Sequence, residues 1–183
     1  MILAAADGHV ATAGAFGALG FSVKPADLAA ILATCRMEIE VPEVIFVEVT
    51  GRFQPGVMRR DLALRLLDHF GTSLLKGKIL ALQGAAVRGL SEAGKMALCN
   101  MIGEMGAVTG LIPPPESASD SPVLRLDASE VVALIAGPGS PPKIHPVKEL
   151  AGAQVTQVLV GGCSSGRLED VAVLVEAMDG RPV

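Results

Sequence analysis

The sequence predicts an α/β fold, and two features of its 183 residues support this class. Short apolar runs of the kind that form strands alternate with segments in which apolar residues recur at helical spacing. No internal repeat interrupts this alternation. The expected strands are Met1 to Ala6, which we expect to be buried, Val44 to Gly51, Lys78 to Leu82 and Val155 to Val160.

Local end signals place helices between these strands. Pro25 suits the first position of one helix, which Val41 and Pro42 stop, and Ser91 is a candidate N-cap for another. Gly71 can end a third helix. The expected helices are 11–19, the segment that starts at Pro25, 61–70, the segment from Ser91 through Met105, and 166–177.

Two proline-rich stretches, 113–122 and 137–142, interrupt the second half of the chain. Neither is expected to form regular structure, because proline lacks a backbone donor and fixes its own φ angle. Around them we expect extended backbone at 108–112 and 123–136, with short antiparallel elements in the middle of the chain.

Composition excludes several classes of function. Half of the residues are hydrophobic but only 3% are aromatic, without Trp or Tyr, so no stacking surface for single-stranded nucleic acid exists. A formal charge of −4 also disfavours binding to a phosphate backbone. No apolar stretch approaches the length of a membrane span. Three widely spaced cysteines suit reduced thiols, so we expect a cytoplasmic protein with no nucleic-acid or membrane partner.

Cys163 stands in VGGCSSGRLED, between a predicted strand and a predicted helix. Backbone N–H groups and the positive end of a helix dipole at such a turn favour a thiolate. A thiolate can ligate a metal or attack carbon. The residue can equally be a small side chain that fills the turn, and local sequence leaves these alternatives open.

Asp7 and His9 follow the first predicted strand in ADGHVAT. Alternate residues beyond a strand end point the same way, so the carboxylate can orient the imidazole for proton transfer. The plain alternative is a turn in which Asp7 caps the next helix.

Asn100 and Glu104 are four residues apart in LCNMIGEMGA, so a helix places them on one face. Gly103 and Gly106 beside them allow another element to approach closely. A polar pair on a face of small residues indicates a site, although a solvated stripe gives the same pattern.

The remaining reactive side chains receive no functional role from the sequence. Cys35 and Cys99 have no His or Cys at metal-ligand spacing and are expected to be structural. His69 lies near a predicted helix end, and His145 lies in a proline-bounded loop. The stretch GAFGALG, 14–20, has the wrong spacing for a dinucleotide fingerprint, so a nucleotide-binding α/β domain is the least supported reading.

Taken in order, these segments resemble the iron–sulfur region of large subunits in the aconitase superfamily, especially 3-isopropylmalate dehydratase and homoaconitase. The Asp-His motif followed by a Gly-Ala-Phe-Gly-Ala-Leu stretch is similar to the family's Gly-Asp-Ser-His-Thr region. The resemblance is collinear over essentially the whole chain. The matching stretches are ADGHVATAGAFGALGF, VEVTGRFQPGVMRRDLAL, CNMIGEMGA, LDASE and GGCSSGRLED.

This resemblance implies a hydro-lyase that acts on a small hydroxy-carboxylic acid with a 4Fe–4S cluster. By residue, Cys163 resembles a cluster ligand and Asn100 a neighbour of the cluster. Glu104, His9 and Asp7 resemble the network around the iron-bound hydroxyl. The implied fold is a three-layer α/β/α lobe from 1–43 and 116–183, with an inserted α+β lobe at 44–115.

The chain also departs from the family pattern. Gly8 replaces the motif's Ser, Ser164 and Ser165 replace Thr-Asn, and the paired cysteines that complete the cluster are not present. We therefore expect no cluster and no activity in this chain alone. One reading is a partial large subunit completed by a small subunit or a complementary piece. The other is a non-catalytic binding or assembly module. Both leave apolar surface exposed and favour a homo-oligomer.

Overall fold

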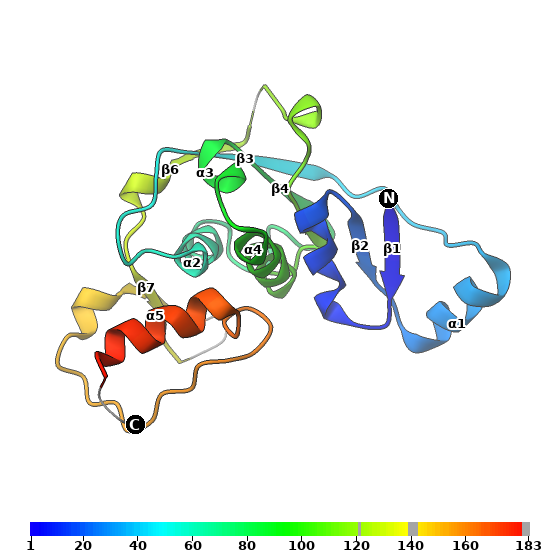
Figure 1. Ribbon diagram of the computed structural model, residues 1–183. Helices are drawn as coiled ribbons and strands as arrows, with labels where there is room; N and C mark the ends of the chain where they lie inside the picture. Colours follow the sequence, from blue (N-terminus) through cyan, green and yellow to red (C-terminus); the bar gives the residue numbers. More distant parts are fainter. Residues whose placement is uncertain (121, 139–142, 181–183) are drawn as a thin grey trace.

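A four-stranded parallel sheet forms the centre of the computed structural model, which describes residues 1–120, 122–138 and 143–180. The strand order β5-β4-β3-β6 requires a crossover between each pair of strands, and helices supply two of these connections (Figure 1). The α/β class predicted from the sequence is confirmed. The strands are β3 (Val44–Thr50), β4 (Ile79–Gln83), β5 (Thr109–Leu111) and β6 (Leu124–Asp127).

The hydrophobic core lies between this sheet and the helices α2 (Arg59–Phe70) and α4 (Glu92–Glu104), which lie on the same side of it (Figure 1). The short helix α3 (Ala85–Arg88) follows β4. Residues of β3 alternate between buried and less buried, as expected for a strand with one face on the core. The fully buried leucines of this core are Leu62, Leu66, Leu75, Leu80, Leu82 and Leu98.

The N-terminal segment adds a smaller parallel pair, β1 (Ile2–Ala5) with β2 (Leu19–Ser22). The 3-10 helix η1 (Gly8–Phe16) connects these strands and packs against α4 and β5. This packing is very close, since a Cβ atom at Gly14 would lie 1.6 Å from the Gly110 carbonyl oxygen. The helix α1 (Pro25–Thr34) then extends away from the sheet (Figure 1).

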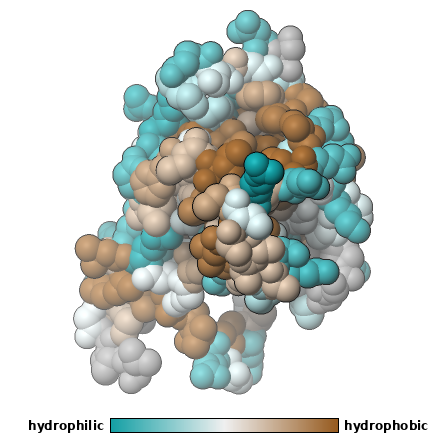
Figure 2. All heavy atoms as spheres, turned by 90° about the vertical axis from the view of Figure 1, so that its right-hand side faces the viewer, coloured by the Kyte–Doolittle hydropathy of each residue, from teal (hydrophilic) through white to brown (hydrophobic). Residues whose placement is uncertain are grey.

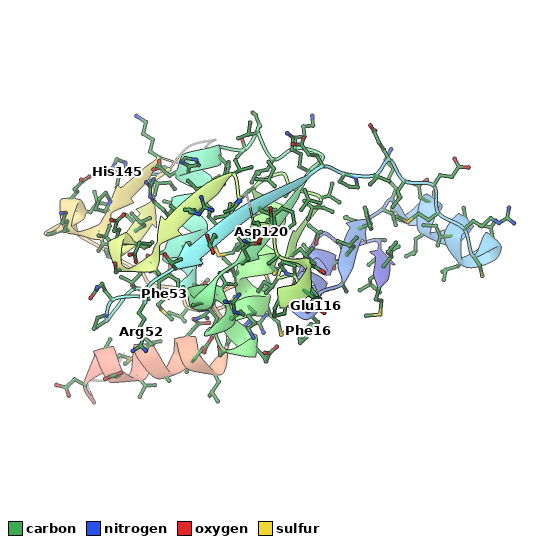
Figure 3. All side chains as sticks on the ribbon, turned by 90° about the horizontal axis from the view of Figure 1, so that it is seen from above. Phe16, Arg52, Phe53, Glu116, Asp120 and His145 are labelled. Atoms are coloured by element: carbon green, nitrogen blue, oxygen red, sulfur yellow. The ribbon has the colours of Figure 1, made fainter. Side chains whose placement is uncertain are left out.

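The C-terminal half is built from short elements. An antiparallel pair lies beyond the main sheet, and its His145 is at the opposite end of the molecule from α1 (Figure 3). A long irregular stretch then leads to the last helix. The elements are η2 (Pro115–Ser117), η3 (Ala128–Glu130), β7 (Leu134–Ala136), β8 (Ile144–Pro146), η4 (Val147–Leu150) and α5 (Leu168–Met178).

Three sequence predictions about this architecture were wrong in part. The strand at Ile2–Ala5 exists but is not buried, because among the described residues it pairs with β2 alone. The expected helix over 11–19 is a 3-10 helix that begins earlier, at Gly8. No strand forms over Val155 to Val160, where the backbone has no ladder partner among the described residues.

Other boundaries follow local backbone geometry. The helix that starts at Pro25 ends at Thr34, well before Pro42, because Cys35 adopts a left-handed conformation with φ of 52°. The proline-rich stretch 113–122 contains one 3-10 turn, η2, and the predicted break at 137–142 falls largely on residues outside the described ones. The extended stretch 123–136 is split into β6 and β7 by η3.

The division into two lobes stays a prediction. The main sheet takes β3, β4 and β5 from the segment 44–115, while β6 comes from the segment 116–183. In parallel register, Val47 lies opposite Leu124 and Val49 opposite Leu126, so the sheet continues across the predicted boundary at 115 and 116.

Much apolar surface is exposed, as expected from the sequence. Neither α1 nor α5 has a buried residue, and brown apolar surface is visible on the side of the molecule that carries α1 and β1 (Figure 2). Met1, Ile2, Phe16 and Leu32 are among the exposed side chains. None of the described helices is long and apolar enough to cross a bilayer.

The close approach of η1 to β5 makes Gly14 and Gly8 a matched pair of test positions. We expect Gly14→Ala to lower the free energy of unfolding by at least about 1 to 3 kcal/mol, because its methyl group would overlap backbone. Gly8→Ala should cost less than about 0.5 kcal/mol, since nothing lies within 4 Å of that position. Urea unfolding measures both values, and equal losses would contradict the packing described here.

Candidate functional site

A pocket of about 280 Å³ brings together three of the five residues that the sequence singled out. Asn100 and Glu104 reach it from α4, and Cys163 reaches it from the loop before α5. Apolar side chains form much of the remaining wall. The full lining is Arg60, Leu64, Leu67, Asn100, Met101, Glu104, Met105, Cys163 and Ser164.

Asn100 is fixed in this wall by its position on α4. The residue is 4% exposed, and its Nδ2 donates to the Thr12 hydroxyl oxygen of η1 at 3.1 Å. Its Oδ1 is buried and has no hydrogen-bond partner within the described part of the chain. An unsatisfied buried acceptor costs about 1 to 3 kcal/mol, so this oxygen is suited to accept from a ligand.

Small residues bring the turn after β1 against the end of α4. A Cβ atom at Gly103 would lie 3.2 Å from Ala11 Cβ and 3.7 Å from the Gly8 carbonyl oxygen. Gly106 has a φ of 88° and reverses the chain after the helix. The predicted close approach at Gly103 is confirmed.

Asp7 and His9 contact each other at this turn but do not line the pocket. His9 Nδ1 lies 2.6 Å from Asp7 Oδ1, and the same oxygen accepts from the His9 backbone N–H at 2.7 Å. Asp7 is also the N-cap of η1, so the capping role and the orientation of the imidazole coexist. The backbone hydrogen bond, followed by the side-chain contact, lowers the pKa of the Asp7 carboxyl below 3.8.

Cys163 is exposed in an irregular loop. Gly162 precedes it with a φ of 85°, and α5 begins five residues later, at Leu168. The thiol is therefore not placed at a helix N-terminus, and that part of the sequence interpretation was wrong. A hydrogen bond within this loop joins its two ends, since Arg167 Nη2 donates to the Cys163 carbonyl oxygen at 3.4 Å.

Arg59 attaches the start of α5 to the core. Its side chain is 6% exposed, and its guanidinium pairs with Asp170 and lies 3.2 Å from a Glu169 carboxylate oxygen. The second Glu169 oxygen accepts from the Ser91 hydroxyl at 2.8 Å. Gly94 leaves room for this arginine, since a Cβ atom there would lie 3.3 Å from Arg59 Cδ. These polar contacts hold the Cys163 loop over α4.

Two aspartates begin their helices in the same manner. Asp61 accepts from the Met58 backbone N–H at 2.7 Å, and Asp170 accepts from the Arg167 backbone N–H at 3.0 Å. Each aspartate lies three residues after the N-cap, where a carboxylate satisfies a free donor and is stabilised by the positive end of the helix dipole. The other oxygen of Asp61 accepts from Leu134 N at 2.7 Å and ties β7 to α2.

Sequence reasoning gave no role to Arg59 or Arg60. The sequence did contain a signal for them. Two arginines at the start of a helix lie unfavourably at the positive end of its dipole, so they need anionic or polar partners elsewhere. Arg60 Nη1 donates to the Ser165 hydroxyl oxygen, so both arginines contact the segment that carries Cys163.

The described residues supply one thiol to this pocket. Cys99 is fully buried on α4, and burial raises the pKa of its thiol to about 12, which excludes an easily formed thiolate. Cys35 is exposed at the end of α1 and does not line the pocket. Within 1–120, 122–138 and 143–180, no three His, Cys, Asp or Glu side chains converge to hold a metal ion. Cys163 suits one ligand of a cluster, but these residues do not fit a whole cluster.

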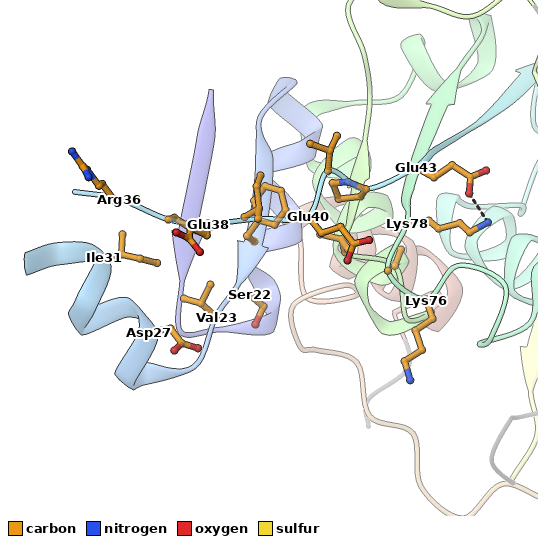
Figure 4. Close-up of a pocket in the computed structure, with 18 of the residues that line it drawn as sticks. Ser22, Val23, Asp27, Ile31, Arg36, Glu38, Glu40, Glu43, Lys76 and Lys78 are labelled. Carbon is orange, nitrogen blue, oxygen red and sulfur yellow. Dashed lines mark ion pairs between the residues drawn. The ribbon is translucent and has the colours of Figure 1, made fainter. Parts of the chain in front are cut away.

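A larger groove of about 980 Å³ lies elsewhere, between α1, the segment 36–43 and the loop before β4 (Figure 4). It contains none of the five predicted site residues. Its charges are mixed, and Lys78 Nζ is paired with Glu43 at 2.8 Å. The larger groove holds none of the predicted residues, whereas the smaller pocket holds three of them.

The fold and this pocket define a mixed α/β protein with a small, largely apolar pocket beside an exposed thiol. Comparison with known proteins narrows this class. The aconitase family (aconitate hydratase) matches residues 1–121, more than half of the chain. The chain belongs to this family.

Similar proteins extend over the whole chain. A 3-isopropylmalate dehydratase large subunit of Methanopyrus kandleri is 34% identical and a probable homoaconitase large subunit of Methanosarcina mazei is 36% identical, each over 100% of this chain. A 3-isopropylmalate dehydratase large subunit of Desulfitobacterium hafniense is 31% identical, also over 100%. The chain spans 49%, 52% and 48% of these three proteins, about half of their length. Their names imply a small subunit as a partner within the family.

The Asp7 contacts predict a low carboxyl pKa that depends only partly on the His9 side chain. NMR titration should give Asp7 a pKa below 3.8. Because the ionised form is favoured in the folded state, any stability it contributes is present above 3.8 and is lost as the pH falls through the lowered value.

In His9→Ala the backbone donor remains, so the Asp7 pKa should rise but stay below 3.8. Asp127, whose pKa is lowered by Ser129, is the internal control and should not change. An Asp7 pKa that returns fully to 3.8 in His9→Ala would show that the backbone hydrogen bond is not the main cause.

The Arg59 contacts predict that one substitution releases α5. We expect Arg59→Met to accelerate hydrogen exchange of α5 amides at least about tenfold, because it leaves the nearly buried Asp170 without its cation. Arg65→Met is the matched control on the same helix, since Arg65 and Asp68 form an exposed pair worth at most about 1 kcal/mol. Equal effects of the two variants would contradict a specific role of Arg59.

Proposed function

We propose that this chain is part of the large subunit of a hydro-lyase that removes water from a small hydroxy-carboxylic acid. The observation that carries the proposal is the shared pocket of Cys163, Asn100 and Glu104 in a chain of the aconitase family. The names of the similar proteins support this reaction class. Because the chain spans about half of their length, the activity of the whole protein is part of the proposal.

In this proposal each site residue has a distinct task. Cys163 supplies one thiolate ligand to a 4Fe–4S cluster, which is consistent with its exposure at the pocket. A bound cluster with an open iron position supplies Lewis-acid polarisation of the substrate hydroxyl. Asn100, which lines the same pocket as Cys163, would offer its free Oδ1 as a hydrogen-bond acceptor. Glu104 exchanges a proton with the departing or attacking water.

The pair of Asp7 and His9 is proposed to take part in the same proton transfer. The carboxylate contacts His9 Nδ1, which leaves Nε2 available to face a ligand. Both side chains are exposed, and Gly8 between them lies against Gly103, next to Glu104. A substrate held at the end of α4 would have these groups nearby.

Cluster assembly requires more thiolates than the described residues provide in this pocket. We propose that a complementary polypeptide or a further segment of the large subunit supplies them, and that a small subunit completes the substrate site. The exposed apolar surface supports association with such partners. A second copy of the chain and a cytoplasmic location stay predictions from the sequence.

A second candidate is a non-catalytic binding or assembly module of the same fold. The single thiol of the pocket favours it, together with Ser164 and Ser165 where the family resemblance has Thr-Asn. Such a module would keep the fold and the apolar contact surface without binding a cluster.

Anaerobic iron–sulfur reconstitution separates these functions. The chain alone should take up no stable cluster, whereas the chain with a complementary large-subunit piece and a small subunit should gain the visible absorbance of a 4Fe–4S cluster and dehydrate isopropylmalate. Cys163→Ser should abolish both signals, because one ligand is lost, and Cys35→Ser should preserve them. Failure to form a cluster under any pairing would overturn the hydro-lyase proposal and favour the binding module.

A further inference from the structure

Arg60 places a positive charge in the pocket beside Cys163. It is the second residue of α2, is exposed to solvent, and shares the pocket with Cys163 and Ser164. Its guanidinium has five N–H donors, and the Ser165 hydroxyl accepts from one nitrogen, Nη1. No further hydrogen bond or ion pair of Arg60 occurs with any described residue. Most of its donors are therefore free for a ligand.

Arg60 needs an acceptor from a ligand, whereas Asn100 needs a donor. Its buried Oδ1 lacks a donor among the described residues, while its Nδ2 is held by Thr12. A ligand for this pocket should thus carry an acceptor for Arg60 and a hydrogen-bond donor for Asn100. A hydroxy-carboxylate provides both groups, through its carboxylate oxygens and its hydroxyl.

The rest of the pocket sets the size and charge of the ligand. About 280 Å³ accommodates a small organic acid, and Leu64, Leu67 and Met101 offer apolar contact to its carbon chain. Glu104 is the other charged residue that lines the pocket, and it is exposed, so solvent screens its repulsion of an anion. A guanidinium can bind a carboxylate through two parallel hydrogen bonds, which fixes orientation as well as charge.

We propose that Arg60 is a carboxylate-binding residue of this pocket and that Asn100 Oδ1 accepts a hydrogen bond from the hydroxyl of the same ligand. The proposal rests on the proposed function for the ligand class, a small hydroxy acid. It adds the two residues that bind the carboxylate and the hydroxyl of that acid. Arg60 is then a determinant of substrate binding that acts independently of the cluster.

Binding of malate to the chain without a cluster tests this assignment. Malate carries a hydroxyl between two carboxylates, and succinate is the same acid without the hydroxyl. NMR titration of the parent chain should show saturable malate binding that weakens at high salt. Arg60→Gln should weaken malate binding about tenfold, as expected for loss of a charged hydrogen-bonded contact. Arg65→Gln, on the same helix but outside the pocket, should leave it unchanged.

Two further variants separate direct contact from an effect on the loop. Ser165→Ala removes the hydroxyl that Arg60 contacts but keeps the guanidinium, so malate affinity should stay within about twofold. Asn100→Ala should remove the preference for malate over succinate, because the hydroxyl then loses its acceptor. Folding of every variant is checked by urea unfolding.

Several outcomes overturn the proposal. They are a loss in Ser165→Ala as large as that in Arg60→Gln, equal malate affinity in Arg60→Gln and the parent, and the absence of saturable malate binding by the parent. None of these results bears on cluster assembly with a complementary polypeptide, which tests the proposed function separately. Conversely, malate binding that depends on Arg60 supports the assignment even where reconstitution fails.

Discussion

The geometry of the candidate site depends on one buried guanidinium. Arg59 at the start of α2 holds Asp170 and Glu169 at the start of α5, and the Cys163 loop lies directly before these residues. No buried apolar residue of α5 contributes to this attachment. The thiol therefore occupies its position over α4 through electrostatics, whereas α4 itself is fixed by apolar packing.

Helix α4 is the element that contacts the other parts of the candidate site. Its apolar side, with Leu98 and Ile102, belongs to the core, and its polar residues Asn100 and Glu104 face the pocket. Gly103 and the contact of Gly14 with Gly110 bring η1 close enough for the Thr12 hydroxyl to hold Asn100. The same approach places the Asp7 and His9 turn at the end of α4. Small residues thus decide which functional groups can meet, since a single methyl group at Gly14 would separate the two elements.

The sequence predicts the main elements well where local signals and burial agree. Ser91 is the N-cap of α4, Gly71 follows α2, and Asn100 with Glu104 face one pocket, all as expected from spacing. Val155 to Val160 shows where local signals fail, because an apolar pattern indicates extended backbone but cannot supply a neighbouring strand. The Arg59 contacts escape prediction for a related reason. Residues 59 and 170 are 111 positions apart, and only the fold brings their charges together.

The unpaired oxygen of Asn100 bears on whether the pocket serves a ligand. A packed, non-catalytic module gains nothing from a buried acceptor without a donor, because such a group costs about 1 to 3 kcal/mol. Exchange of Asn100 for an apolar residue would remove the unpaired acceptor and extend the apolar wall of Leu64 and Met101. Thr12 holds the amide with the oxygen unpaired, and Arg60 adds unpaired donors to the same pocket. A donor and an acceptor that lack partners in one small pocket are complementary to a polar ligand, and this complementarity favours a binding site over a filled turn.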